Sequence, residues 1–322
     1  MKQIGSFIEL ELPRGREFYK GENNIARLNT GRAAIWHAFR LTGAEKIWIP
    51  YYQCESVRDF LLRKGCTVRY YHQDVTFTPI DIEAGENDAV LLVNYYGIMS
   101  QKRMSSLAEK YPHAIIDNSQ AFFCRPLENL LNVYSARKFV GVPDGAYVIG
   151  RDAHFNVDEY PQCYSSDTAG FLMKRIEYGC EGKAYEDREL NEARIDSEDA
   201  MKMSKLTRTL LDGADYEQNM ERRRKNFIKA DELFSGINLL NAKMYFDEDT
   251  IPMVYPLVVE DDDLLKKFLD AKHFQGHWWK YITDELPADT FEHWLSRYVI
   301  PITIDQRYDE NDLMHLRAIV DK

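Results

Sequence analysis

The chain lacks several features that mark common classes of protein. Its five cysteines form no Cys-x-x-Cys pair and are odd in number, which fits free thiols in a reducing compartment better than a disulfide framework or a zinc site. No stretch approaches the roughly 18 consecutive apolar residues of a membrane-spanning helix. The N-terminus leads into charged residues at positions 9, 11, 14 and 16, which argues against a secretory signal. We therefore expect a cytoplasmic protein without a membrane partner.

The sequence motifs of several cofactors are missing as well. Neither a Gly-x-Gly-x-x-Gly nor a Walker loop occurs, so dinucleotide and triphosphate sites lack their usual marks. The eight histidines show no metal-ligand spacing, and no Gly-x-Ser-x-Gly elbow is present. The net charge of −11 argues against nucleic acid as a partner, although a local positive site can still bind a small anion. A small-molecule ligand is the remaining expectation.

Short apolar runs alternate with helical periodicity from about residue 25 to 150. The runs that we interpret as strands lie at 46–50, 67–71, 89–93, 114–116, 131–135 and 146–149. This alternation predicts a mostly parallel sheet with helices on both faces, an α/β fold. The Asp144-Gly145 pair is typical of a hairpin turn leading into the last of these strands.

The character of the chain changes after about residue 152. Residues 183–235 are highly charged and largely helical, and their basic run at 222–225 is interpreted as a solvated helix face. Strands are expected at 253–259 and 298–304, with helices between and after them. We predict a large α/β domain with an N-terminal arm over 1–182, a helical link over 183–235, and a small α+β domain over 236–322.

The most informative residues lie at the tips of two neighbouring strands. Asp117 follows the strand at 114–116. Ser135 lies at the end of the next strand, and Lys138 comes three residues after Ser135. Ligands of parallel sheets bind at the carboxyl ends of strands. Pyridoxal phosphate (PLP) needs a lysine to form a Schiff base and a carboxylate to keep its ring nitrogen protonated. We therefore predict a PLP site with Lys138 as the catalytic residue, Asp117 beside the ring nitrogen and Ser135 on the phosphate.

A second segment offers a cradle for the phosphate. Thr30, Gly31 and Arg32 form a turn that opens a predicted helix. Unpaired amides at a helix N-terminus bind anions, and glycine permits a close approach. Gln120, three residues after Asp117, is near enough to contact the ring substituents or the substrate.

In their order along the chain, these motifs resemble those of the DegT-type sugar aminotransferases, a branch of the fold type I PLP enzymes. The resemblance covers about residues 25 to 320. Asn29 to Ala34 is similar to the family's SGRAAL stretch, and Ile116 to Ala121 is similar to its EDaAQA element. Further segments that resemble family motifs are Ile47 to Pro50, Asn94 to Gly97, Ser135 to Gly145, Tyr255 to Leu257, Trp278-Trp279 and Pro301 to Tyr308.

The resemblance implies a large, mostly parallel sheet of seven strands and a small C-terminal domain. It also implies an aminotransferase that moves an amino group from an amino acid, typically glutamate, to a keto sugar, typically linked to a nucleotide. Lys138 would hold the aldimine and then act as general base. A homodimer with active sites at the interface is expected. Cys54 stands where the family has the aromatic residue that stacks on PLP, so that residue would be Tyr52 or its neighbour Tyr51. Candidate substrate contacts are Tyr95, Arg137, Trp278 and Arg307.

Two other interpretations stay open at this point. The chain could use PLP for a different reaction of an amino acid, such as racemisation or elimination. It could also be a binding or regulatory protein that has kept the fold and lost turnover. The segment Gly141 to Gly145 has fewer glycines than the family motif, and no Asn-Tyr-Arg element is recognisable near 190–204; both observations favour the binding protein.

Overall fold

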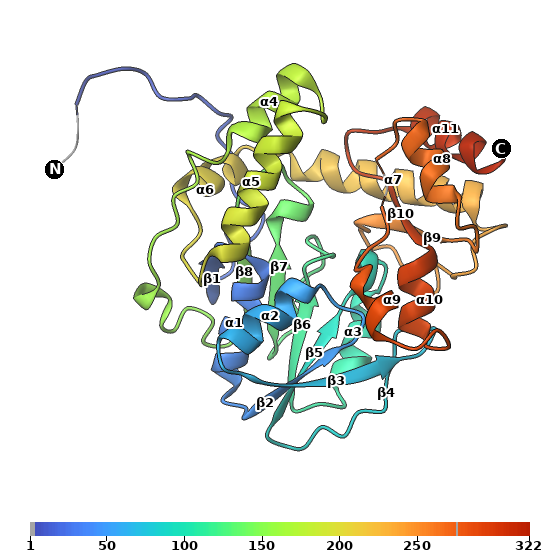
Figure 1. Cartoon of the computed structure of the whole chain (residues 1–322). Helices are drawn as coiled ribbons and strands as arrows, with labels where there is room; N and C mark the ends of the chain where they lie inside the picture. Colours follow the sequence, from blue (N-terminus) through green and yellow to red (C-terminus); the bar gives the residue numbers. More distant parts are fainter. Residues whose placement is uncertain (1–3, 275) are drawn as a thin grey trace.

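The structure, a computed structural model, describes residues 4–274 and 276–322. Its largest element is an eight-stranded sheet (Figure 1). The strands lie in the order β1 (Ile25–Leu28), β8 (Ala146–Ile149), β7 (Leu131–Ser135), β6 (His113–Asn118), β5 (Asp88–Val93), β2 (Lys46–Pro50), β3 (Thr67–Gln73) and β4 (Pro79–Ile80). Neighbours from β7 to β3 are parallel, whereas β8 is antiparallel to β1 and β7, and β4 is antiparallel to β3. The expected mostly parallel sheet is confirmed, and the two-residue β4 is added at one edge.

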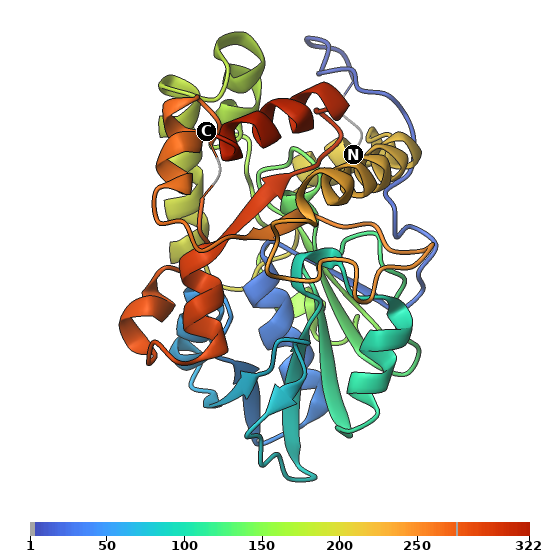
Figure 2. The ribbon, with the colours of Figure 1, turned by 90° about the vertical axis from the view of Figure 1, so that its right-hand side faces the viewer.

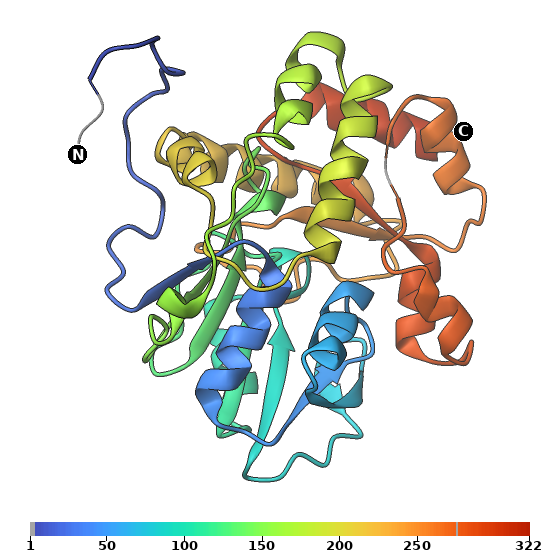
Figure 3. The same ribbon diagram turned by 60° about the vertical axis from the view of Figure 1, so that its left-hand side comes forward.

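Helices cover both faces of this sheet, as the sequence pattern predicts. The helices α1 (Gly31–Thr42) and α2 (Glu55–Arg63) lie together on one face (Figure 3), in a hydrophobic cluster with Leu91 and Ile115. Helix α3 (Gln101–Ala108) lies on the other face, in a cluster with Leu92 and Ile116. Because successive side chains of a strand point to opposite faces, β5 and β6 contribute to two cores. This explains why their sequences are continuous apolar runs rather than alternating ones.

The rest of the chain is helical around a second, small sheet. A 3-10 helix (Val157–Glu159) precedes α4 (Gly170–Tyr178) and α5 (Lys183–Ser197), which pack against each other as a hairpin, and then α6 (Lys205–Asp212) and α7 (Tyr216–Phe234). Strand β9 (Val254–Val258) pairs antiparallel with β10 (Val299–Thr303) next to α7 and α11 (Figure 2). The accompanying helices are α8 (Leu264–Asp270), α9 (Tyr281–Glu285), α10 (Phe291–Tyr298) and α11 (Glu310–Val320). Within the described residues, none of the helices combines the length and apolar character that a membrane span requires.

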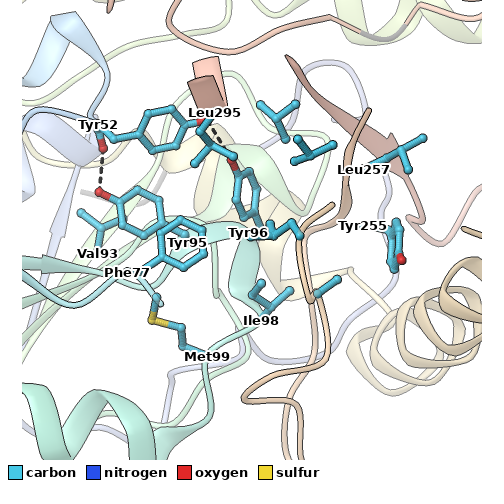
Figure 4. Close-up of a cluster of buried hydrophobic side chains, with 14 of the residues drawn as sticks. Tyr52, Phe77, Val93, Tyr95, Tyr96, Ile98, Met99, Tyr255, Leu257 and Leu295 are labelled. Carbon is cyan, nitrogen blue, oxygen red and sulfur yellow. Dashed lines mark hydrogen bonds between the residues drawn. The ribbon is translucent and has the colours of Figure 1, made fainter. Parts of the chain in front are cut away.

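The two sheets share one hydrophobic cluster. It contains Ile116 of β6 and Tyr96, which follows β5, together with Phe227 of α7, Tyr255 of β9 and Leu295 of α10. Figure 4 shows part of this cluster, where the tyrosines after β2 and β5 meet side chains of the C-terminal part. Apolar area removed from water at this junction stabilises the position of the C-terminal part against the carboxyl edge of the large sheet. The domain boundaries near 182 and 235 remain a prediction.

The connection between β7 and β8 differs from the expected two-residue hairpin turn. Residues 136–145 join the two strands, beginning with a 3-10 helix (Ala136–Lys138). The Asp144 carboxylate is fully buried and accepts hydrogen bonds from Ser204 N (2.8 Å), Ser204 Oγ (2.6 Å) and Ser165 Oγ (3.1 Å). Ser204 is the N-cap of α6. Asp144 therefore joins the loop to the start of α6 instead of forming a tight turn, a contact that local sequence does not reveal.

The basic run at 222–225 is also not a uniformly solvated helix face. Arg223 is only 2% exposed. Its guanidinium donates to Met253 O (3.0 Å) and Gln306 Oε1 (3.1 Å), and it lies 4.6 Å from the centre of the Phe139 ring. Burial lowers the pKa of Arg223 to about 10, and the carboxylate of Asp305 opposes this shift. The residue thus packs α7 against the loop that follows Lys138.

We predict that Asp144→Ala lowers the free energy of unfolding by about 2–3 kcal/mol, because it leaves the buried amide and hydroxyl donors of Ser204 without their acceptor. Urea denaturation followed by circular dichroism measures the change. Asp158→Ala is the matched control. This carboxylate is solvent-exposed, and its one ion pair, with Lys202 Nζ, is long at 3.8 Å and therefore weak. Equal unfolding midpoints for the two variants would contradict the anchoring role.

Candidate functional site

The start of α1 meets two serines at the carboxyl edge of the sheet. A Cβ placed on Gly31 would lie 3.3 Å from Ser119 Oγ, a tight contact, and 3.9 Å from Ser135 Cβ, an ordinary one, so the glycine leaves space between the helix and these side chains that a larger residue would fill. Thr30 is the N-cap, and its Oγ1 accepts a hydrogen bond from Ala33 N (3.2 Å). The amides of Gly31 and Arg32 donate to no described residue. Two free amides and two hydroxyls at a helix N-terminus form a site suited to a phosphate.

Asp117 is the penultimate residue of β6, in the middle of this edge. It is 3% exposed, and its Oδ1 accepts a hydrogen bond from Ser119 N (2.9 Å) while Oδ2 accepts one from Gln53 Nε2 (3.3 Å). These bonds hold the carboxylate in one orientation and offset part of the cost of burying it. Asp117 is therefore a rigid, buried acceptor at the centre of the site.

Gln53, which the sequence analysis did not select, connects Asp117 to the C-terminal part. Its Oε1 accepts a hydrogen bond from Cys54 N (2.9 Å), and its carbonyl accepts one from Tyr281 Oη (2.5 Å). Ser119 was missed too, although it lies within the motif that identified Asp117. A polar residue shortly after the strand that ends at Pro50 is the only signal that could have marked Gln53, because its partners lie far away in sequence.

Lys138 follows β7, close enough to Asp117 to feel its charge. Its side chain as a whole is exposed to solvent, whereas desolvation of the amine by the surrounding protein lowers its pKa from the ordinary value. The charges of Asp117 and Cys54 oppose this lowering, and the positive charge of Arg137 adds to it. Nζ forms no hydrogen bond or ion pair with any residue in the described ranges. A lysine that loses its proton readily and has no fixed partner is suited to act as a nucleophile or base.

The side chains of Arg32 and Gln120, two residues predicted to contact the phosphate and the ring, bond other parts of the chain. The Arg32 guanidinium pairs with Asp196 Oδ1 (2.6 Å) and also bonds Ile195 O, both at the end of α5. Only its main-chain amide remains at the start of α1. Gln120 Oε1 accepts a hydrogen bond from Tyr96 N (2.7 Å), so this side chain holds the loop after β5.

The tyrosines selected from the sequence lie in the hydrophobic cluster (Figure 4). Tyr52 is fully buried, its hydroxyl bonds the Tyr96 hydroxyl (2.7 Å), and its ring centre lies 4.5 Å from that of Trp279. Tyr95 is also fully buried and donates to Tyr52 O (2.6 Å) and Gln73 Oε1 (2.8 Å). Tyr52 and Tyr95 are thus both held inside the hydrophobic cluster by contacts with other side chains.

The remaining substrate candidates are each engaged with a neighbour. Arg137 forms an ion pair with Glu192 of α5, which places α5 beside the Lys138 segment. Trp278 stacks on Tyr96, with ring centres 5.3 Å apart. Arg307 pairs with Asp305 (2.6 Å), and half of its side chain is exposed. Arg137 is thus placed beside Lys138 by sequence, whereas Trp278 and Arg307 belong to the C-terminal part.

The donor set fits PLP. The amides of Gly31 and Arg32 with the hydroxyls of Ser119 and Ser135 match a phosphate. The buried Asp117 carboxylate matches a protonated ring nitrogen, and the readily deprotonated Lys138 matches an aldehyde carbon. These groups come from the ends of β1, β6 and β7, three strands on one side of the sheet.

Comparison with known proteins places this fold among aminotransferases. No protein-family model and no curated protein matches the chain. Among solved structures, a DegT/DnrJ/EryC1/StrS aminotransferase from Brucella abortus is similar at 12% identity over 94% of this chain and 86% of that one, with a TM-score of 0.63. A sugar aminotransferase from Micromonospora echinospora is similar at 15% identity over 93% and 87%, with a TM-score of 0.61. NtdA from Bacillus subtilis, with bound cofactor PMP, is similar at 13% identity over 94% and 75%, with a TM-score of 0.63.

These likenesses extend over nearly the whole chain. They confirm the fold class expected from the sequence: a large α/β sheet domain followed by a smaller C-terminal part, as in the sugar aminotransferases. At these identities the likeness concerns the fold.

The depressed pKa of Lys138 predicts early reactivity toward amine reagents. As the pH rises, a lysine with a lowered pKa becomes neutral sooner than a lysine with the ordinary pKa, and only the neutral amine reacts. In competitive labelling of dialysed protein with acetic anhydride and peptide mapping, Lys138 should reach half-maximal reactivity at a lower pH than a free lysine-containing peptide in the same solution. An equal or higher midpoint for Lys138 would show that Asp117 outweighs burial.

Proposed function

We propose that this chain is a PLP-dependent aminotransferase of the DegT type. It would transfer an amino group from an amino acid donor, with glutamate as the first candidate, to a keto sugar, with nucleotide-linked sugars as the first acceptors to test. The observation that carries the proposal is the assembly of Lys138, Asp117 and the start of α1 at one edge of the sheet. The fold similarity to the sugar aminotransferases supports it.

The residues that would hold PLP each have a distinct part. The amides of Gly31 and Arg32 and the hydroxyls of Ser119 and Ser135 would bind the phosphate. Asp117, fixed by Gln53 and Ser119 N, would accept a hydrogen bond from the protonated ring nitrogen. When bound, PLP supplies an electron-withdrawing ring that stabilises negative charge on the substrate carbon next to the nitrogen.

Lys138 would perform the proton transfers. Its amine is the group that would hold PLP covalently. When not so engaged, Nζ would take a proton from the substrate carbon and give it back, which is general acid–base catalysis at one positioned nitrogen. The lowered pKa of Lys138 favours this role because the amine is neutral over a wider pH range.

The exposed apolar side chains support a homodimer. Ile4, Phe7, Ile8 and Leu10 of the N-terminal arm are exposed, and so are Met173, Ile176 and Leu190 of the α4–α5 hairpin. Exposed apolar groups at this density mark interaction surfaces. We infer that a second copy covers some of them and completes the active site.

The state of the cysteines supports a location in the cytoplasm. All five are free thiols, as expected in a reducing compartment.

A first experiment tests covalent attachment at Lys138. Wild-type protein incubated with PLP should develop a visible absorption band, and borohydride treatment should fix the cofactor to the peptide that contains Lys138. Lys138→Ala should lose both the band and the label. Subsequent addition of glutamate should bleach the band as the cofactor is converted to its amine form.

Each result of that experiment separates the open interpretations. Label spread over surface lysines, or full activity in Lys138→Ala, would overturn the proposal. A labelled Lys138 with no response to any amino acid donor would favour a binding or regulatory protein. Elimination or racemisation products without transfer would favour a PLP enzyme of another reaction type.

The phosphate cradle is tested through Gly31. In Gly31→Ala the new methyl group lies about 3.3 Å from Ser119 Oγ and narrows the space next to the free amides. We expect the PLP dissociation constant to rise by about tenfold, or ~1.4 kcal/mol, with unchanged circular dichroism. Gly21→Ala is the control, because nothing lies within 4 Å of its added Cβ. Equal PLP affinity in both variants would place the phosphate elsewhere.

A further inference from the structure

Arg137, the residue before Lys138, has a guanidinium that is only partly used. Its one hydrogen bond to the described part of the chain runs from Nη2 to Glu192 Oε1 of α5. Its Nε is buried and has no partner among the same residues. A buried N–H of a cation is costly when it has no acceptor. Arg137 therefore offers a donor that a ligand could satisfy.

The unused donor lies on the edge of the guanidinium that binds carboxylates. Nε and Nη2 form one edge, which matches both oxygens of a carboxylate. Arg307 shows this edge fully used, because its Nε and Nη2 donate to the two oxygens of Asp305, at 2.8 and 2.6 Å. Glu192 uses only half of the same edge of Arg137. A carboxylate placed squarely in front of it would gain a second hydrogen bond that Glu192 does not make.

Glu192 can leave Arg137 without disturbing the helix that carries it. Its side chain is 33% exposed, so a rotation brings the carboxylate into water. Helix α5 is held at this place by other bonds: Asn191 Nδ2 donates to Pro143 O (3.0 Å), and the Arg32 guanidinium bonds the end of the helix. Ion pairs with this exposure contribute little to stability. The contact with Glu192 is therefore one that a ligand can replace.

The position of Arg137 indicates which carboxylate would bind there. Arg137 and Lys138 belong to the same 3-10 helix; burial lowers the pKa of the Lys138 amine, and the nearby charge of Arg137 adds to this effect. In the proposed reaction this amine takes a proton from the donor carbon that bears both the amino group and the α-carboxylate. That carboxylate is one bond from the carbon, so it has to lie near Nζ when the proton moves. A cation beside Nζ would attract it.

We propose that Arg137 binds the α-carboxylate of the amino donor through Nε and Nη2, and that Glu192 occupies this place until the donor arrives. The inference rests on the proposed function and deepens it, because it assigns the group that selects an α-amino acid over an amine without that carboxylate. Glu192 is then a competitor within the chain that lowers the affinity for the donor.

The test compares glutamate with 4-aminobutyrate, which is glutamate without the α-carboxylate. Ligand-observed nuclear magnetic resonance measures the two dissociation constants on the full chain without PLP, and their ratio isolates that group. We expect the wild type to bind glutamate at least about tenfold more tightly, the effect of hydrogen bonds to a charged group. In Arg137→Leu the ratio should fall to about twofold or less, whereas the dissociation constant of PLP should stay within about twofold of the wild type.

The competitor is tested by a second substitution. Glu192→Gln should strengthen glutamate binding by about two- to fivefold, because an amide holds the guanidinium less strongly than a carboxylate does. Glu189→Gln is the matched control, since Glu189 lies one turn earlier on α5, is 53% exposed and pairs with Arg188 at 3.4 Å. Equal glutamate affinity in the two variants would contradict the competition.

Absence of glutamate binding, equal binding of the two ligands by the wild type, or an unchanged ratio in Arg137→Leu would overturn the inference. So would a loss of PLP affinity with the ratio intact, because Arg137 would then bind the cofactor phosphate. If Arg137→Leu does not fold, Arg137→Lys preserves the test: it keeps the charge but lacks the two-donor edge, so it should also lose most of the ratio. Circular dichroism verifies each fold.

The same proteins separate this inference from the proposed function. A chain that binds glutamate through Arg137 but forms no band with PLP contradicts the proposed function alone. A chain that forms the band at Lys138, and whose band is bleached by the same glutamate concentration in wild type and Arg137→Leu, contradicts the assignment of Arg137 alone.

Discussion

The burial of one carboxylate at the end of the central strand β6 organises the candidate site. A buried, ionised carboxyl group is costly unless hydrogen bonds or an opposite charge surround it. Asp117 receives a bond from Ser119 N, just after β6, and one from Gln53 Nε2 in the loop after β2. The shape of both loops follows from this requirement. Through Gln53 O and Tyr281 Oη the same requirement extends to α9, so the C-terminal part is linked to the acid by two hydrogen bonds in series.

The sequence predicted the parts of the site that depend on strand order. Continuous apolar runs identified β5, β6 and β7, and the topology of a parallel sheet then brings Asp117 and Ser135 to the same edge. Thr30 and Gly31 followed from helix-capping rules, which act within four residues. Each of these features is determined by residues close together in the sequence, so the local sequence pattern was sufficient to predict it.

The sequence did not predict the contacts between distant segments. The Arg32 guanidinium meets Asp196, and Gln53 meets Tyr281, over separations of 164 and 228 residues. Asp144 has the local pattern of a hairpin turn, but the donors of Ser165 and Ser204 make its carboxylate a buried anchor. Tyr52 was selected as a stacking ring, yet the apolar surface of the C-terminal part draws it into the shared cluster with Trp279. In each case a tertiary partner outweighs the local preference.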